Sequence, residues 1–302
     1  MNINFEYYRI FYYVAKYNNF TKAARALGSS QPNVTRAMNC LESEAGCTLL
    51  VRTNRGVHLT PEGERLYVRV AAAMQQLQLA EDELTESAGL EHGIVTIGAS
   101  ETALSIYLLE QLKRFRIEYP GIQIRLQNYS TPQAVKAVKN GEVDFAVVTT
   151  PVTISEPLKK TELQSFQEVL VCGKTFQALG NRKLRLAEVQ NYPFICLGKE
   201  TTTYQFYQQI FASYGLTLKP DTEAATTDQI LLLVKHELGL AFLPEPMIRQ
   251  AAARQEIIPL SVQEVIPERK VCVVYDARRP MSGAAQRLKK MLPEEATEKI
   301  FQ

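Results

Sequence analysis

The spacing of apolar residues changes along the chain and divides it into three tracts. The first tract opens with aromatic and apolar residues at helical spacing, namely Phe5, Tyr8, Phe11, Tyr12 and Ala15. This pattern predicts a helix with an aromatic inner face. Asn18 and Asn19 interrupt the pattern, so the predicted helix ends there.

Two short helices joined by a tight turn are predicted next. Residues 21–27 have high helix propensity, with Asn19 or Thr21 available as N-cap and Gly28 as the left-handed residue that ends the helix. The following helix can begin after Ser30, which is a good N-cap. Its apolar seam consists of Val34, Ala37, Met38 and Leu41. Because that seam must face the preceding helix, the pair is predicted to form a helix-turn-helix.

The second of these helices has a polar face suited to reading DNA. Gln31, Asn33, Thr35 and Arg36 project away from the seam near the amino end. Asparagine and glutamine can pair with adenine, arginine with guanine, and threonine with a phosphate or a thymine methyl. A merely solvated polar face is the alternative. The adjacent turn, the local charge and the hairpin that follows favour DNA contact.

A β-hairpin is predicted at residues 49–59. Two short apolar runs flank a turn that contains Asn54 and Gly56. Arg52 and Arg55 would then stand on an exposed wing beside the recognition helix, placed for the minor groove or the DNA backbone. Arg55, at the tip, is the stronger candidate, since Arg52 could instead pair with a carboxylate inside the fold.

The second tract is predicted to be one long helix. Thr60 can cap it, and Pro61 suits its first position. An apolar seam then alternates spacings of four and three, through Leu66, Val70, Ala73, Leu77, Ala80 and Leu84. A single helix cannot bury such a coiled-coil seam alone, so we expect it to dimerise with a second copy of the chain. Packing on its own chain's domain is the alternative.

The third tract alternates strands and helices from Gly89 onward. The predicted strands are 94–98, 122–129, 145–149, 170–172, 194–197, 240–243 and 270–275. Helical patterns lie between most of them, at 106–119, 202–214, 228–238 and 284–292. Repeated βα units predict an α/β domain with a largely parallel sheet covered on both faces. This tract is long enough for two lobes, with ligands expected in the crevice at the carboxyl ends of the strands.

Composition and charge narrow the function classes. The 302 residues include 46% hydrophobic and 22% charged residues, which is typical of a globular protein. The first residues lack the features of a signal peptide, so we expect a cytoplasmic protein without membrane segments. Five cysteines without regular spacing do not form a disulfide framework. The net charge is only +2, but residues 1–58 hold seven basic and three acidic side chains, so the amino-terminal part is the basic one.

Taken together, the chain resembles a LysR-type transcriptional regulator. The resemblance is carried by FTKAARALGSSQPNVTRAMNCLE, the wing followed by LTPEG, then EHGIVTIGAS, FRIEYPGIQI, KNGEVDFAVV and ELGLAFLPE. It implies a winged helix-turn-helix domain at 1–60, a dimerising linker helix at 61–89 and a two-lobed, periplasmic-binding-protein-like effector domain at 90–302. Lobe I would comprise about 90–162 and 266–302, and lobe II about 163–265. It further implies a homodimer or homotetramer that binds promoter DNA, contacts RNA polymerase and responds to a small effector.

The resemblance also assigns site residues. Ser30, Gln31, Pro32, Thr35 and Arg36 fall on the family's recognition-helix motif and Arg55 on its wing. The implied effector contacts are Ser100, Thr102, Thr131, Thr149, Thr201, Thr202 and Thr203. Hydroxyls and free amides at helix starts suit a small carboxylate or similar anion, although each hydroxyl could equally be a helix cap. The chain departs from the family in having no arginine at Thr149 and Glu110 after Leu108-Leu109, so the ligand's identity does not transfer.

The sequence leaves three alternative functions to consider. An enzyme is disfavoured because the three histidines form no metal-ligand spacing and no nucleophile elbow, P-loop or dinucleotide fingerprint occurs. We therefore expect no catalytic residues, metal or cofactor. A redox sensor is the second alternative, but Cys172, Cys196 and Cys272 lie in apolar strands, where free cysteine is usually inert. The third is a constitutive DNA-binding protein of the same fold.

Overall fold

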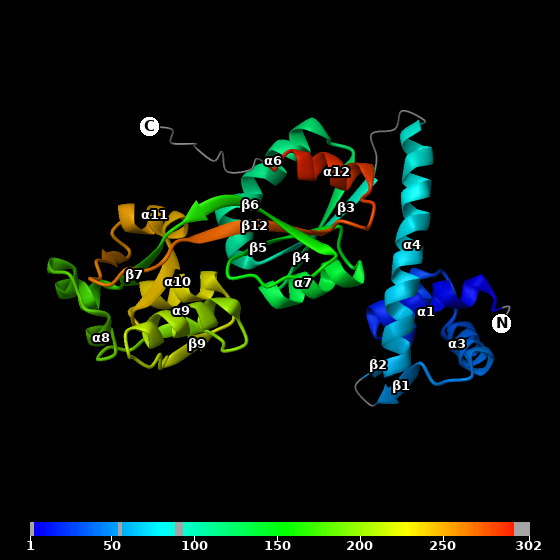
Figure 1. Cartoon of the computed structure of the whole chain (residues 1–302), viewed down its shortest axis with the longest axis horizontal. Coiled ribbons are helices and arrows are strands. Elements are labelled where there is room, and N and C mark those ends of the chain that lie inside the picture. The colour runs from blue at the N-terminus through cyan, green and yellow to red at the C-terminus, as the bar shows by residue number, and fades with distance from the viewer. Residues whose placement is uncertain (1–2, 54–55, 88–92, 293–302) are drawn as a thin grey trace. The chain divides into compact units, whose positions relative to one another are not determined.

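The computed structural model describes residues 3–53, 56–87 and 93–292. The chain forms two compact units, one within the first 88 residues and one made of most of the remainder. Figure 1 shows the chain coloured from the blue amino terminus to the red carboxyl terminus. The two units are described separately below.

The amino-terminal unit is a winged helix-turn-helix, as predicted. Its elements are α1 (Phe5–Tyr17), α2 (Phe20–Ala26), α3 (Gln31–Ala45), the antiparallel strands β1 (Leu50–Thr53) and β2 (Gly56–Leu59), and α4 (Pro61–Ser87). Local chemistry fixes the ends of the first three helices. Asn18 ends α1 with a φ of 49°, the Asn19 side chain accepts from the Lys22 amide, and Ser30 caps α3. Gly28 adopts the predicted left-handed conformation, with a φ of 60°.

The core of this unit differs from the predicted aromatic face in one respect. Phe11 and Ala15 are buried together with Val14, Val34, Met38 and Leu41. Phe5, however, is 54% exposed, so its expected place in the inner face was wrong. It is the first residue of α1 and therefore lies beyond the surface that α2 and α3 cover.

Helix α4 begins as predicted and divides its apolar seam between two environments. The Gly63 amide donates to the Thr60 hydroxyl, which makes Thr60 the cap. Leu66 and Val70 pack into the core of the amino-terminal unit, so this part of the seam is used by its own chain. Ala73, Leu77 and Ala80 are exposed. The side chain of Leu84 lies outside the described residues.

The larger unit contains two lobes, and lobe I is built on a mixed sheet. The lobe I sheet has the order β4 (Ile122–Asn128), β3 (Gly93–Ala99), β5 (Phe145–Thr149), β12 (Arg269–Asp276) and β6 (Leu158–Phe166). Strand β3 is parallel to β4 and β5, whereas β12 is antiparallel to β5 and β6. Figure 1 shows α6 (Leu109–Glu118) and α12 (Gly283–Lys290) on one side of this sheet and α7 (Thr131–Asn140) on the other.

Lobe II has two small sheets. One has the order β10 (Ala241–Pro244), β7 (Glu168–Cys172) and β11 (Ile258–Leu260), with β7 antiparallel to both neighbours. The other pairs β8 (Ile195–Leu197) with β9 (Thr222–Ala224) in parallel. Its helices are α8 (Leu186–Val189), α9 (Thr202–Ser213), α10 (Thr227–Lys235) and α11 (Glu245–Ala253). The expected largely parallel sheet was therefore wrong, because β7 and β12 run against the strands beside them.

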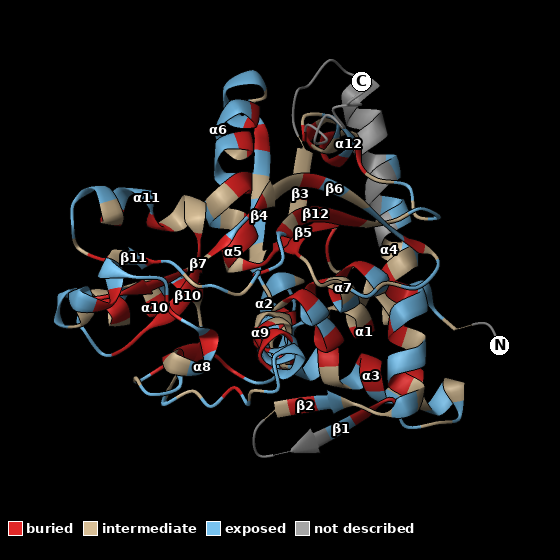
Figure 2. Cartoon of the chain, turned by 60° about the vertical axis from the view of Figure 1, so that its left-hand side comes forward, coloured by how far each residue is buried: buried red, intermediate tan, exposed pale blue. Residues whose placement is uncertain are grey.

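The chain crosses between the lobes at two neighbouring places. Strand β6 pairs with β12 up to Phe166 opposite Arg269, so lobe I extends through residue 166, slightly past the approximate bound of 162. Lobe II begins with β7, directly after Gln167, whose side-chain amide donates to the Ile266 carbonyl on the returning segment at 2.6 Å. Figure 2 shows buried residues, in red, concentrated on the central strands and on the inner sides of the helices.

Candidate functional sites

The amino end of α3 presents the predicted polar face to solvent. Gln31, Pro32, Asn33 and Arg36 are exposed, and Thr35 is half-buried. The Gln31 side chain accepts a hydrogen bond from the Thr21 hydroxyl of α2 at 3.1 Å, which orients it at the start of the helix. The Ser30 hydroxyl accepts from the Asn33 amide at 3.4 Å, so its side chain serves as the cap.

The two predicted wing arginines are not placed in the same detail. Arg52 lies in β1 opposite Val57, but its side chain is outside the described residues. Arg55 lies outside the described residues altogether. Their contact with DNA stays a prediction.

A cleft between lobes I and II gathers every predicted effector residue. It encloses an open volume of about 950 Å³, solvent at its mouth included. Its lining contains Ser100, Thr102, Thr131, Thr149, Thr201, Thr202 and Thr203. These hydroxyls come from both lobes, so one ligand in the cleft can contact both lobes at once. Whether they touch an effector stays a prediction.

Helix starts supply most of this lining. Ser100 precedes the continuous helix formed by α5 (Glu101–Ala103), a π-helical turn and α6, and its hydroxyl accepts from the Ala103 amide. Thr131 begins α7, and Thr201 caps α9 by accepting from the Tyr204 amide at 3.1 Å. Thr226 caps α10. Four helices therefore direct their amino termini, which favour negative charge, toward the same space.

The cleft lining also includes acidic groups that the sequence analysis did not single out. Glu101 and Glu200 are its charged side chains among the described residues, and no lysine, arginine or histidine lines it there. Burial, together with the nearby Asp228 carboxylate, raises the pKa of Glu101 to about 7. The cleft thus combines helix amino termini with carboxylates.

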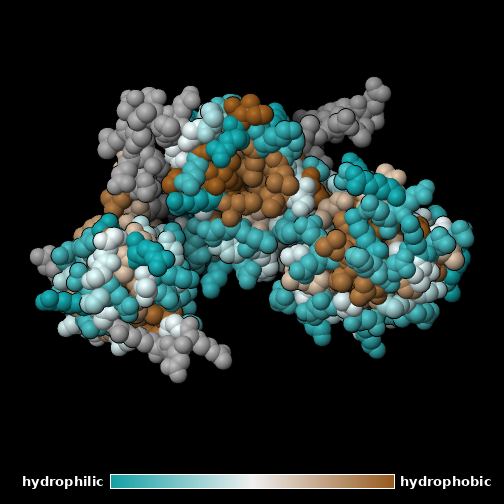
Figure 3. Space-filling model, turned by 180° about the vertical axis from the view of Figure 1, so that it is seen from behind, coloured by the Kyte–Doolittle hydropathy of each residue, from teal (hydrophilic) through white to brown (hydrophobic). Residues whose placement is uncertain are grey.

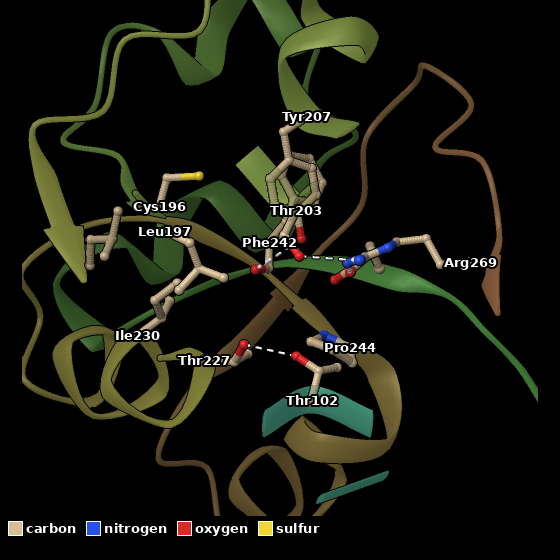
Figure 4. Close-up of a pocket in the computed structure, with 12 residues that line it drawn as sticks. Thr102, Cys196, Leu197, Thr203, Tyr207, Thr227, Ile230, Phe242, Pro244 and Arg269 are labelled. Atoms are coloured by element: carbon tan, nitrogen blue, oxygen red, sulfur yellow. Dashed lines mark hydrogen bonds and ion pairs between the residues drawn. The ribbon is translucent and has the colours of Figure 1, made fainter. Parts of the chain in front are cut away.

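Hydrogen bonds connect the lobes beside the cleft. The hydroxyls of Thr102 and Thr227 lie 2.9 Å apart, and the Thr227 amide donates to a Glu101 carboxylate oxygen at 3.0 Å. Figure 4 shows the first of these pairs joined at one edge of a smaller inner pocket. This inner pocket shares Thr102, Thr203 and Thr227 with the cleft.

A buried ion pair forms one wall of the inner pocket. Arg269 and Glu168 are both almost fully buried, and their closest atoms are 2.5 Å apart. Arg269 also donates to the Thr149 hydroxyl at 2.9 Å, the Thr203 hydroxyl at 3.1 Å and the Thr150 carbonyl at 2.7 Å. The guanidinium therefore joins residues of both lobes (Figure 4). Position 149 carries no arginine itself, but the guanidinium of Arg269, from β12, bonds to the Thr149 hydroxyl.

The second oxygen of Glu168 has no such partner. Its Oε2 is buried and accepts no hydrogen bond from the described part of the chain. Burial and the negative charge of the nearby Glu168 raise the pKa of Tyr207. The Tyr207 hydroxyl nevertheless donates to the Phe242 carbonyl, at 3.4 Å. Glu168 therefore retains one acceptor without a donor beside the inner pocket.

No group of three or more histidine, cysteine or acidic side chains suited to a metal ion occurs among the described residues. Within the same residues, no helix is long and apolar enough to span a membrane.

A winged helix-turn-helix unit, a long helix and a two-lobed domain with a polar cleft together define a transcriptional regulator with separate DNA-binding and ligand-binding parts. Residues 5–64 match the family described as bacterial regulatory helix-turn-helix protein, lysR family, and residues 88–297 match the LysR substrate binding domain. The chain belongs to the LysR family of transcriptional regulators.

Individual relatives agree with this assignment. The HTH-type transcriptional regulator YofA of Bacillus velezensis is 27% identical over 93% of this chain and 94% of its own. Full-length OxyR from Pseudomonas aeruginosa superposes with a TM-score of 0.74 at 18% identity, covering 97% of this chain and 94% of that one. CbnR in complex with its target DNA gives a TM-score of 0.67 at 17% identity over 96% and 98% of the two chains. The two structural likenesses show the fold alone.

Proposed function

We propose that this protein binds promoter DNA through the outer face of α3 and the β1–β2 wing, and that a small molecule in the interlobe cleft controls this activity. The observation that carries the DNA-binding part is the exposed row of hydrogen-bonding side chains at the amino end of α3, above a fully buried seam. Promoter DNA as the partner also places the protein in the cytoplasm.

Arg36→Ala tests this directly. Loss of a bidentate contact to guanine should weaken binding to a specific site by about 1 to 3 kcal/mol and relax base preference at one position. The site is first selected from random DNA with the unmodified protein, and binding is then measured on it and on random DNA at fixed salt. Arg65→Ala, which removes an exposed arginine paired with Glu62 on α4, is the control. Equal loss on both DNAs would make Arg36 a phosphate contact.

Self-association is part of the proposal. Binding of two half-sites needs two recognition helices, and the exposed apolar positions of α4 offer a surface for a second copy. Figure 3 shows apolar side chains, in brown, gathered on one face of the effector domain. On α6, Leu109 is 54% and Ile117 75% exposed. A homodimer through α4, extended to a homotetramer through effector domains, fits these two surfaces, and RNA polymerase is the expected recipient of the signal.

The redox alternative has weaker support. Burial raises the pKa of Cys172 and Cys272 to about 11 and that of Cys196 to about 12. All three thiols therefore stay protonated near neutral pH and are poor targets for oxidants. A constitutive regulator is the remaining alternative, and it predicts DNA binding that no small molecule alters. No observation favours catalysis over regulation.

A further inference from the structure

The charges around the interlobe cleft point to a more specific ligand than an anion. The cleft's charged lining residues, Glu101 and Glu200, are both acidic, and they come from opposite lobes. Arg269 is the cation nearest the inner pocket in the described chain, but it is 1% exposed and already donates to Glu168, Thr149, Thr150 and Thr203. Among the described residues, a ligand with only negative charge would meet two carboxylates and no available cation.

Positive potential in the cleft comes instead from backbone. The first residues of α7, α9 and α10 line it, and each of these helices has at least nine residues. The first amides of a helix have no acceptor within the helix and can bind an acidic group. Around them the lining is rich in hydroxyls, which can donate to the same group.

The carboxylates of Glu101 and Glu200 favour a ligand that also carries a cationic group. The raised pKa of Glu101 reflects a buried carboxylate beside another acid, Asp228. Glu168 adds an independent observation, since its Oε2 is a buried acceptor without a donor at the inner pocket next to the cleft. An ammonium group supplies both a positive charge and three donors.

We propose that the effector is a small zwitterion of amino-acid size, with its acidic group at the helix amino termini and its primary amine among Glu101, Glu200 and the inner pocket. This inference rests on the proposed function and names the chemical class of the ligand. The acidic group is expected between the starts of α7 and α9, so that the ligand joins the two lobes.

Matched ligand sets test the class. The full-length protein is titrated by calorimetry with each of the common amino acids, and with the des-amino acid and the decarboxylated amine of every one that binds. At least one amino acid should bind with an affinity tenfold or more above both of its matched analogues. A des-amino acid or a neutral polyol that binds as tightly as every amino acid would overturn the proposal, as would the absence of binding by all of them.

Two variants test the placement of the amine. Glu101→Gln keeps an acceptor for the Thr227 amide and removes the charge, and Glu200→Gln does the same at the opposite wall. Each should weaken binding of the amino acid at least fivefold and leave binding of its des-amino analogue unchanged or stronger. The control is Glu162→Gln, an exposed carboxylate paired with Lys270. Equal losses for both ligands would contradict the assignment.

A parallel measurement separates this inference from the proposed function. Specific DNA binding is followed with and without the amino acids. Specific binding that no amino acid occupies or alters would overturn the ligand class and leave the regulator intact. Failure of the unmodified protein to bind any selected DNA would overturn the proposed function itself.

Discussion

At the scale of single residues, Arg269 is the side chain on which the interlobe region most depends. Its guanidinium joins Glu168 of lobe II to Thr149 and Thr150 of lobe I, and it lies over the rings of Phe166 and Phe206 at 5.5 and 5.1 Å. Arg269→Met leaves the Glu168 carboxylate buried without a counter-charge. We expect the free energy of unfolding to fall by about 3 to 5 kcal/mol, measured by denaturant titration of the full-length protein.

The double variant Arg269→Met with Glu168→Leu is the matched control. Replacing both partners of a buried ion pair by apolar side chains of similar volume often costs little, because no buried charge is left unpaired. The double variant should therefore recover most of the lost stability. If it is as unstable as the single variant, the hydrogen bonds of Arg269 to the threonines, and not the ion pair, hold the region together.

This pair also shows what sequence alone could not reveal. The seven cleft hydroxyls were predictable because the family resemblance pointed to strand ends and helix starts, which the local sequence marks. Arg269 and Glu168 are separated by 101 positions, and each is the first residue of a strand, where a charge usually faces solvent. Only the pairing of β12 with β6, next to β7, brings them together. Glu101 and Glu200 are adjacent in sequence to Ser100 and Thr201, but the family resemblance assigned only the hydroxyl residues to the effector site.

At the scale of elements, short-range chemistry was predictable and strand order was not. The end of α1, both ends of α2 and the start of α3 lie at the asparagine, glycine and serine residues expected, because caps are set by adjacent residues. Strand β6 was missed because its sequence, LKKTELQSF, is mostly polar at an edge of the sheet. Strand β12 runs antiparallel to its neighbours because the chain enters it on returning from lobe II. No local sequence pattern indicates that return.

Helix α4 gives the prediction that belongs to this scale. Leu77 is 45% exposed, whereas Leu66 and Val70, earlier in the same seam, already pack on their own chain. Leu77→Lys should therefore impair dimerisation without unfolding the amino-terminal unit, because a charge in a coiled-coil seam opposes association. Light scattering should give a lower mass, and binding to two half-sites should fall more than binding to one.

The neighbouring position supplies the control for α4. Gln76→Lys introduces the same charge at an exposed residue outside the seam. It should leave the mass unchanged. Equal effects of Gln76→Lys and Leu77→Lys would indicate that charge on the helix surface, and not loss of the seam, weakens association; an unchanged mass for Leu77→Lys would remove α4 as the dimer contact.

At the scale of the whole molecule, Glu101 makes contact between the lobes sensitive to pH. It lies on lobe I, bonds to the Thr227 amide of lobe II and faces Asp228 of the same lobe. Because burial and Asp228 raise its pKa to about 7, from an ordinary value of 4.5, the folded protein binds a proton more tightly than the unfolded chain. Its contribution to stability is thus fully present below about pH 4.5 and is lost as the pH rises through 7.

The thermal midpoint of the unliganded protein should therefore increase as the pH is lowered from 8 to 6, and this increase should be smaller in Glu101→Gln. Carboxylates whose pKa ion pairs lower, such as Glu188 and Glu245, lose stability only as the pH falls below about 4.5, outside this window. Scanning calorimetry of both proteins across the window gives the difference. If the thermal midpoints of the two proteins change in parallel between pH 8 and 6, Glu101 is ionised in the folded state throughout this window. The contact between the lobes would then not depend on its protonation.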